Sequence, residues 1–384
     1  MAVGLAGVLL LAGIIGSRLM VKNNSAGNVA AITAEVAKLN NEGDYAGAQK
    51  FLLEKIKSDP ALELKLALAN SYLDEGSVRG KEAEASKKAQ EILFELDKNY
   101  QGVYLYDLIG YSYEIVNNFD KAMEYYTKSI ALDKTSVNTL FSMGHIHWFL
   151  GETDQARELY RQAEQLITNN TDKSVQIKVY TGIAVLSSNF SEAEKYLLKA
   201  MPLSESRAFK AELYADLANV KLAERDNAGA FEYASKAVTA DPSSALAYLA
   251  FAKSAMVDKA TFAKNWDKVK ESLFKAIVLA PKKAEPQHWQ GKLEFIAGMT
   301  DQAIISYMNA LKLLDGDNSL NVNTRKNLRS DINFDIAVAY LLKNDKPRAE
   351  VYIKDAFIDN PVKVTYMLQH SEQLKELRVM LKIK

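Results

Sequence analysis

Small and aromatic residues recur along this chain at helical spacings, and the spacing itself repeats. Each unit of the pattern has a small residue, a second small residue twelve positions later, and a tyrosine four positions after that. The last two residues of each unit are four positions apart and therefore lie on one face of a helix, so the pattern is typical of helices. The complete pattern occurs three times, and its first two copies are 34 residues apart: Gly110, Ala122 and Tyr126; Gly144, Ala156 and Tyr160; Gly291, Ala303 and Tyr307.

This pattern resembles the tetratricopeptide repeat, a helix–turn–helix unit of the same period. In that family the small residues stand where two helices cross closely, and the aromatic residue fills the gap to the next repeat. The resemblance implies an all-α fold, a right-handed superhelical solenoid whose extended surface holds other proteins. About nine repeats are expected over residues 29–361. The clearest begin at Val103, Val137, Ala211, Ala284 and Ser330.

Three repeats depart from the regular length. Longer connections between the two helices are expected at residues 73–89 and 256–269, and the repeat from Ser174 is one residue short. After Pro361, apolar residues again follow helical spacing. Because a solenoid needs a terminal helix over its last apolar face, we expect a capping helix over residues 362–384. Its apolar positions are Leu374, Leu377, Met380 and Leu381.

The first 17 residues carry no charged side chain and are followed by Arg18 and Lys22. If the segment extends to Val21, it makes a helix of about 31 Å, enough to cross a hydrocarbon core of about 30 Å. We therefore expect a transmembrane anchor over residues 1–21 and a short linker over 22–28. A cleaved signal peptide is the alternative, although it would need a basic residue before the apolar run and a clear cleavage site.

Both nearby positive charges follow the apolar segment, which by the positive-inside rule favours repeats in the cytoplasm. The layout resembles bacterial inner-membrane tetratricopeptide proteins, in particular the lipopolysaccharide assembly protein B family, which also begins with its single span. That family ends in a four-cysteine metal-binding domain, whereas this chain has no cysteine, so only the architecture carries over. A second resemblance is to anchored tetratricopeptide proteins of secretion, pilus or flagellar-motor assemblies, and it implies repeats in the periplasm.

Composition argues against several function classes. Lys and Arg together number 48, as do Asp and Glu, whereas nucleic-acid surfaces are usually strongly basic. With no cysteine and only 4 histidines, a zinc or haem site is not expected. The segment 76–82 resembles a phosphate-binding loop, but it is one residue short and has Glu82 where Ser or Thr is needed. We expect no cofactor, no metal, no nucleic acid and no catalytic activity.

Function is then expected on the inner surface, which the first helix of each repeat lines with its positions 2, 5, 9 and 12. The Lys, Asn and Arg set with which chaperone-binding relatives clamp a terminal carboxylate is absent here. An aromatic surface instead suits an apolar or amphipathic peptide or helix of a protein partner. The alternative is that several rings pack between repeats and never meet a ligand. In the two clearest repeats the predicted residues are Tyr104, Asp107, Tyr111 and Glu114, then Asn138, Phe141, His145 and Trp148.

Two function classes remain open at this stage. One is a membrane-tethered adaptor that recruits a protein partner to a bacterial inner membrane. The other is a structural subunit of a larger envelope machine, held by contacts along both of its faces. In the apolar segment, Ala12 and Gly16 are small residues four apart, as are Gly13 and Ser17. This spacing lets two membrane helices approach closely and would permit a homo-oligomer.

Overall fold

The computed structural model describes residues 26–41, 43–203, 206–317 and 319–383. The predicted anchor, residues 1–21, and residues 22–25 of the predicted linker lie outside these ranges. Over the ranges that are described, no helix combines the length and the apolar character needed to cross a membrane. All regular elements there are helices, as the sequence predicts, and the chain divides into two compact units.

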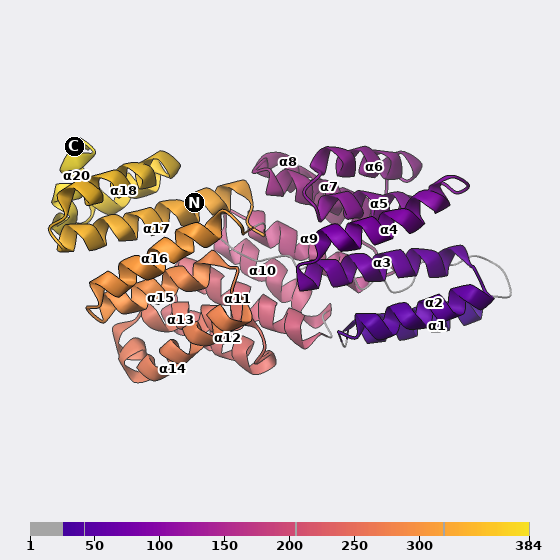
Figure 1. Cartoon of the computed structure of the whole chain (residues 1–384), viewed down its shortest axis with the longest axis horizontal. Coiled ribbons are helices and arrows are strands. Elements are labelled where there is room, and N and C mark those ends of the chain that lie inside the picture. The colour runs from indigo at the N-terminus through magenta and orange to yellow at the C-terminus, as the bar shows by residue number, and fades with distance from the viewer. Residues whose placement is uncertain (1–25, 42, 204–205, 318, 384) are drawn as a thin grey trace. The chain divides into compact units, whose positions relative to one another are not determined.

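The first unit comprises the chain up to Ser187 together with Lys195–Ser206. Its helices form successive pairs in which each first helix packs along the second helix that follows it (Figure 1). A fifth first helix, α9, packs on the last complete pair. The helices are α1 (Ala26–Asn41), α2 (Tyr45–Ser58), α3 (Leu62–Arg79), α4 (Glu82–Asp97), α5 (Val103–Glu114), α6 (Phe119–Leu132), α7 (Val137–Phe149), α8 (Thr153–Gln165) and α9 (Lys173–Leu186).

The second unit comprises Ser188–Glu194 and the chain from Arg207 onward, so α10 (Phe190–Ala200) contributes residues to both units. A short 3-10 turn, Met201–Leu203, follows α10. Helix pairing continues in the same way. The helices are α11 (Arg207–Glu224), α12 (Asn227–Ala240), α13 (Ala245–Met256), α14 (Lys259–Leu279), α15 (Ala284–Ile296), α16 (Thr300–Leu314), α17 (Val322–Leu342), α18 (Lys346–Asp359), α19 (Pro361–Gln369) and α20 (Lys375–Met380).

The turn inside each pair confirms the repeat register that the sequence predicts. In six repeats the fifteenth residue has a left-handed backbone, with φ between 58° and 85°. A left-handed residue after the last helical turn ends a helix and lets the chain reverse, and Gly or Asn adopts it at the lowest cost. Five of the six are Gly or Asn. The six residues are Gly43, Asn117, Gly151, Arg225, Gly298 and Asn344.

The repeated tyrosine fills the space between neighbouring repeats, as the family resemblance implies. Tyr160 is 1% exposed and lies between two glycines, one in its own repeat and one in the next. A Cβ atom added at Gly144 or at Gly182 would lie 2.8 Å from the Tyr160 ring, closer than real Cβ contacts. The absence of a side chain at both glycines therefore allows the ring to fit.

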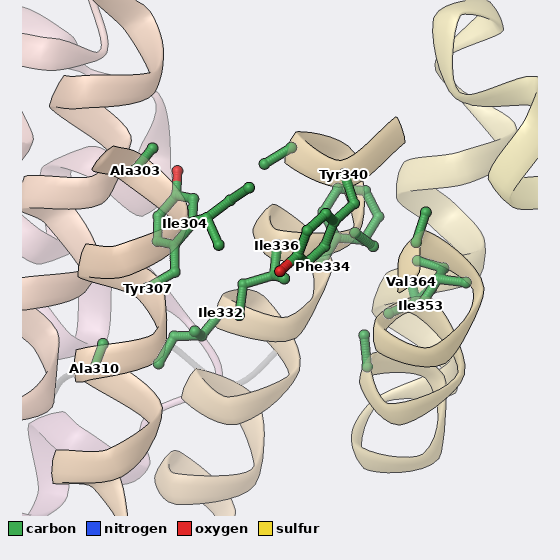
Figure 2. Close-up of a cluster of buried hydrophobic side chains, with 14 of the residues drawn as sticks. Ala303, Ile304, Tyr307, Ala310, Ile332, Phe334, Ile336, Tyr340, Ile353 and Val364 are labelled. Carbon is green, nitrogen blue, oxygen red and sulfur yellow. The ribbon is translucent and has the colours of Figure 1, made fainter. Parts of the chain in front are cut away.

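The same packing builds the core at the C-terminal end of the second unit. Figure 2 shows Tyr307 and Ile304 of α16 facing Ile332 and Ile336 of α17, with Ile353 of α18 beyond. All five side chains are buried. Because α16, α17 and α18 all contribute, neighbouring repeats share one continuous hydrophobic core.

Two sequence expectations need correction. The longer connections at residues 73–89 and 256–269 are largely helical, since α3 continues to Arg79 and α14 begins at Lys259 with a kink at Asn265. The capping segment is not one helix but two, α19 and α20, separated by the 3-10 turn Glu372–Leu374. Leu377 of α20 is fully buried, and Leu374, Met380 and Leu381 pack on the same core.

The first helices of the repeats also contact one another across repeats. α5 contacts both α3 and α7, and α7 contacts α9. No contact of similar extent joins the second helices α4, α6 and α8 of the described chain. The first helices therefore line the closer-packed side of the unit, which we call the inner surface of the first unit (α3, α5, α7 and α9).

Replacing Ala156 with leucine is expected to destabilise the protein by roughly 1–3 kcal/mol. Ala156 is fully buried where α7 and α8 cross, so added volume must push the two helices apart. Thermal melting would show the effect as a lower Tm. As a control, Lys128→Ala on the outer side of α6 should change stability by no more than about 0.5 kcal/mol. Equal tolerance at the two positions would contradict the repeat register.

Candidate functional site

The predicted site residues lie on two neighbouring first helices that contact each other, α5 and α7. The structure therefore brings the two predicted sets together on one surface. Their exposure divides them into two groups. Asp107, Glu114, Phe141 and Trp148 are buried, whereas Tyr104, Tyr111, Asn138 and His145 are half-buried and partly accessible.

Glu114 links three helices beneath the inner surface. The Tyr126 hydroxyl of α6 donates a hydrogen bond of 2.5 Å to Glu114 Oε2, and His145 Nδ1 of α7 lies 2.6 Å from Glu114 Oε1. The Glu114 side chain is only 4% exposed. Because both carboxylate oxygens are engaged from different helices, Glu114 fixes the position of His145 at the surface above it.

Asp107 makes a second link between α5 and α7. Asn138 Nδ2 donates a hydrogen bond of 3.0 Å to Oδ2, and Thr139 Oγ1 donates one of 2.7 Å to Oδ1. Burial raises the pKa of Asp107, although the hydrogen bonds from Asn138 and Thr139 oppose this rise. Asp107 therefore orients Asn138.

Two of the four tyrosines of α5, Tyr104 and Tyr111, are half-buried residues of the inner surface. The Tyr111 hydroxyl lies 2.9 Å from Ser77 Oγ of α3, so the hydrogen bond connects the two helices. Burial, together with the nearby charge of Asp74, raises the pKa values of Tyr104 and Tyr111 above the ordinary value of a phenol. Both hydroxyls therefore stay neutral near pH 7 and can donate or accept hydrogen bonds.

Phe141 and Trp148 differ from the expectation of exposed rings. They are 1% and 6% exposed. Phe141 stacks on Tyr160, with ring centroids 5.2 Å apart, and Trp148 stacks on His145 at 5.4 Å. For these two rings the structure supports the alternative prediction that they pack between helices and do not line a binding surface. Among the predicted aromatic residues of α7, His145, whose ring Trp148 supports, is the one that remains partly accessible.

The structure adds residues of α3 and α9 that the sequence reading missed. Asn70 and Asp74 of α3 are buried, and Asn70 Nδ2 donates a hydrogen bond of 2.9 Å to Asp74 Oδ2. Lys178 of α9 is half-buried, and burial lowers its pKa while the charges of Asp74 and Glu114 oppose the fall. Lys178 is the fifth residue of the repeat from Ser174, so the register could have identified it.

The inner surface of the first unit is thus polar, with a partly accessible outer layer over buried acidic groups. The charges of three buried carboxyl groups, Asp74, Asp107 and Glu114, act on the amine of Lys178. The accessible groups are two phenols, an amide, an imidazole and that amine. Such a surface can donate and accept hydrogen bonds along a peptide, and its excess of acidic groups favours basic side chains over anionic ligands.

In the second unit, ion pairs connect successive first helices. Lys253 Nζ of α13 lies 2.8 Å from Glu285 Oε1 of α15, and Lys292 Nζ of α15 lies 2.8 Å from Asp335 Oδ2 of α17. His288 Nε2 is also 2.7 Å from Asp335 Oδ2. Although burial raises the pKa of Asp335, Lys292 and His288 outweigh it and hold that pKa at about 2.

Replacing Asp335 with asparagine is expected to cost about 2–3 kcal/mol at pH 7, as the lowered pKa implies. An acid with a lowered pKa stabilises the fold above the ordinary carboxyl value, near pH ~4, and loses this stabilisation as pH falls towards 2. Urea unfolding of both proteins between pH 7 and pH 3 should therefore show a difference that shrinks below pH 4. Asp267→Asn, at a side chain 90% exposed, should have little effect at any pH.

Comparison with known proteins supports the repeat assignment directly in part of the chain. The tetratricopeptide repeat pattern matches residues 103–136 and 137–170, with the boundaries that the spacing predicts. These two segments are therefore tetratricopeptide repeats. A search of curated protein sequences finds no match to this chain. The resemblance to the layout of lipopolysaccharide assembly protein B remains a prediction.

Solved structures share the fold at low sequence identity. The human IFIT1 dimer with m7Gppp-AAAA is 15% identical, with a TM-score of 0.59, and the match covers 99% of this chain and 90% of that chain. A Rap protein complexed with competence and sporulation factor is 16% identical, with a TM-score of 0.53 over 89% of this chain and 99% of that chain. These similarities describe the architecture, a stack of tetratricopeptide-like helix pairs.

Proposed function

We propose that this protein is a scaffold that binds a segment of a partner protein on the inner surface of its first unit. The observation that carries the proposal is the row of partly accessible polar side chains on consecutive first helices, Tyr104 and Tyr111 on α5, His145 on α7 and Lys178 on α9. Each is held by a helix of the packed core, so the surface is formed before a partner arrives and loses little entropy on binding.

The chemistry of the surface also specifies the kind of segment. Hydroxyl, amide and imidazole groups can pair with the backbone of a peptide, and the flat faces of Tyr and His provide contact area with few rotatable bonds. The buried carboxyl groups favour a segment that carries basic residues. Of the two expected kinds of partner, an apolar or an amphipathic peptide or helix, we therefore favour an amphipathic one with positive charge.

RNA is the second candidate ligand, because human IFIT1 was solved with m7Gppp-AAAA. The charge of the present surface argues against it. Phosphate recognition requires several Lys or Arg residues along one face, whereas Lys178 faces three carboxyl groups here. We therefore favour a protein partner and treat oligonucleotide binding as a test outcome.

Replacing Tyr111 with alanine is expected to weaken partner binding by about 2 kcal/mol, close to thirtyfold. The partner would first be identified by photo-crosslinking from position 104 on the inner surface, and its affinity then measured for each variant. Tyr366→Ala, at a residue 50% exposed on α19, is the matched control and should leave affinity unchanged. Equal loss in both variants, or binding of a capped oligonucleotide that competes with the partner, would contradict the proposal.

We further propose, from the sequence of residues 1–21 alone, that the protein is tethered to a bacterial inner membrane, with its repeats in the cytoplasm. Full-length protein should then sediment with membranes and require detergent, while residues 23–384 should be released. A mature form that begins near residue 26 would instead identify a cleaved signal peptide. Recovery of the intact chain in the soluble fraction would contradict the anchor.

A further inference from the structure

Two acidic residues on first helices of the second unit are paired with a lysine of the preceding first helix. Glu285 is the second residue of its repeat and Asp335 the sixth of its own, two positions that lie one turn apart on the same face of a helix. Their partners, Lys253 and Lys292, each stand at the ninth position of the preceding repeat. Asp331, at the second position of the same repeat as Asp335, pairs instead with Lys363 of α19. No such ion pair is possible between α11 and α13. The ninth position of the repeat from Ala211 is Asn219, and the second and sixth positions of the next repeat are Leu246 and Ala250.

α11 carries acidic residues at both of these positions, as α17 does: Glu212 at the second and Asp216 at the sixth. In the described part of the chain, neither Glu212 nor Asp216 forms an ion pair or a side-chain hydrogen bond.

Asp216 in particular is buried without a partner. Its side chain is 7% exposed, and its Oδ1 atom has no hydrogen-bond partner. A buried carboxylate in this condition is costly unless a cation or a donor reaches it. The charge of Lys253 of α13 acts on Asp216, but the Lys253 amine is engaged with Glu285.

We propose that Glu212 and Asp216 bind a lysine or arginine side chain of a protein partner. The cation would pair with these two acids of α11 as Lys253 pairs with Glu285 and Lys292 pairs with Asp335. A partner helix or strand laid along α11 would thereby continue the ladder of ion pairs by one step. This site adds to the proposed scaffold function, and it lies in a different unit from the inner surface described above, so either proposal can fail alone.

The titration of the two groups supports an unfilled cation site. Burial raises the pKa of Asp216 to about 7, against the charge of Lys253. Burial and the charges of Asp216 and Asp241 raise the pKa of Glu212 to about 8. By contrast, Asp335, which has its lysine, has a lowered pKa. A bound cation would lower both raised values and release protons, so binding should strengthen as pH rises from 6 to 8.5.

Carbodiimide crosslinking of the full-length protein to the peptide hexalysine, mapped by mass spectrometry at pH 8, tests the site. We expect amide links at Glu212 or Asp216 in clear excess over Glu232, an exposed acid of α12. Hexalysine affinity, measured in parallel by fluorescence anisotropy, should fall about tenfold in the double variant Glu212→Gln/Asp216→Asn. Glu232→Gln should leave this affinity within about twofold. Equal crosslinking at all three acids would overturn the proposal.

Thermal melting of the Asp216→Asn variant tests whether the Asp216 carboxylate lacks a cation partner in the free protein or already has one within the chain. An acid with a raised pKa in the folded state destabilises the fold progressively as pH rises from the ordinary carboxyl value, near pH ~4, to the raised value of about 7. The variant should therefore melt at a higher temperature than the wild type at pH 8, and the difference should vanish below about pH 4. A variant that melts lower at pH 8 would overturn the proposal, as would a crosslink without hexalysine from Glu212 or Asp216 to a lysine of this same chain or of a second copy.

Discussion

Replacing Tyr160 with alanine is expected to destabilise the first unit by about 3–5 kcal/mol. The ring fills a space between Gly144 and Gly182 that no neighbouring side chain can enter, so its removal leaves a cavity between two repeats. Trp148 is the one tryptophan in the first unit, since the other two are Trp266 and Trp289. Urea unfolding followed by tryptophan emission, with circular dichroism for the whole chain, would measure the change.

Removal of the hydroxyl group alone should affect stability differently at Tyr160 and at Tyr126, its equivalent in the preceding repeat. The Tyr160 hydroxyl is buried and has no hydrogen-bond partner, so Tyr160→Phe should leave stability unchanged or raise it slightly. The Tyr126 hydroxyl donates to Glu114, so Tyr126→Phe should cost about 1–3 kcal/mol by leaving a buried carboxylate oxygen unpaired. Equal effects of the two substitutions would contradict the assigned hydrogen bonds.

Replacing Trp148 with alanine should lower stability by about 3–5 kcal/mol, although the sequence suggests a binding residue. Trp148 is 6% exposed and supports the ring of His145, so its loss removes packing inside α7 and its neighbours. The free energy of unfolding would be followed by circular dichroism, because the variant removes the fluorescent probe of this unit.

Leu150→Ala is the control for this prediction. Leu150 follows α7, is 42% exposed, and should change stability by no more than about 0.5 kcal/mol when truncated. If Trp148→Ala instead left stability intact and abolished partner binding, Trp148 would return to the list of contact residues and its packing role would be wrong.

The repeat architecture could be predicted from sequence because its constraints are short in range. The left-handed residue at position 15 is set by the turn between two adjacent helices, and Asn117 and Gly151 satisfy it locally. Gly144 and Ala156 are set by a helix crossing within one repeat. Since every repeat has the same steric requirements, the same residue types recur at the same spacing. The repeat period can therefore be recognised from the sequence alone.

For the candidate surface, the sequence predicted which helix carries each residue but not which side chains are exposed. The register correctly places Tyr104, Asp107, Tyr111 and Glu114 on one helix, but exposure depends on how closely α5, α7 and α9 approach. That approach buries Phe141 while it leaves His145 partly accessible. No local pattern carries this information, because the atoms that cover each ring belong to other repeats.

The sequence by itself thus determined the helix pairs, their register and the helices that carry the predicted site residues, because periodicity and steric size act within about one repeat length. Only the tertiary structure decided which acids are paired. Glu285 and Glu212 stand at the same position of their repeats, yet Glu285 meets Lys253 and Glu212 meets no lysine in the described chain. Pairing depends on the side chain that a separate helix supplies across the interface, and that is a property of the assembled stack.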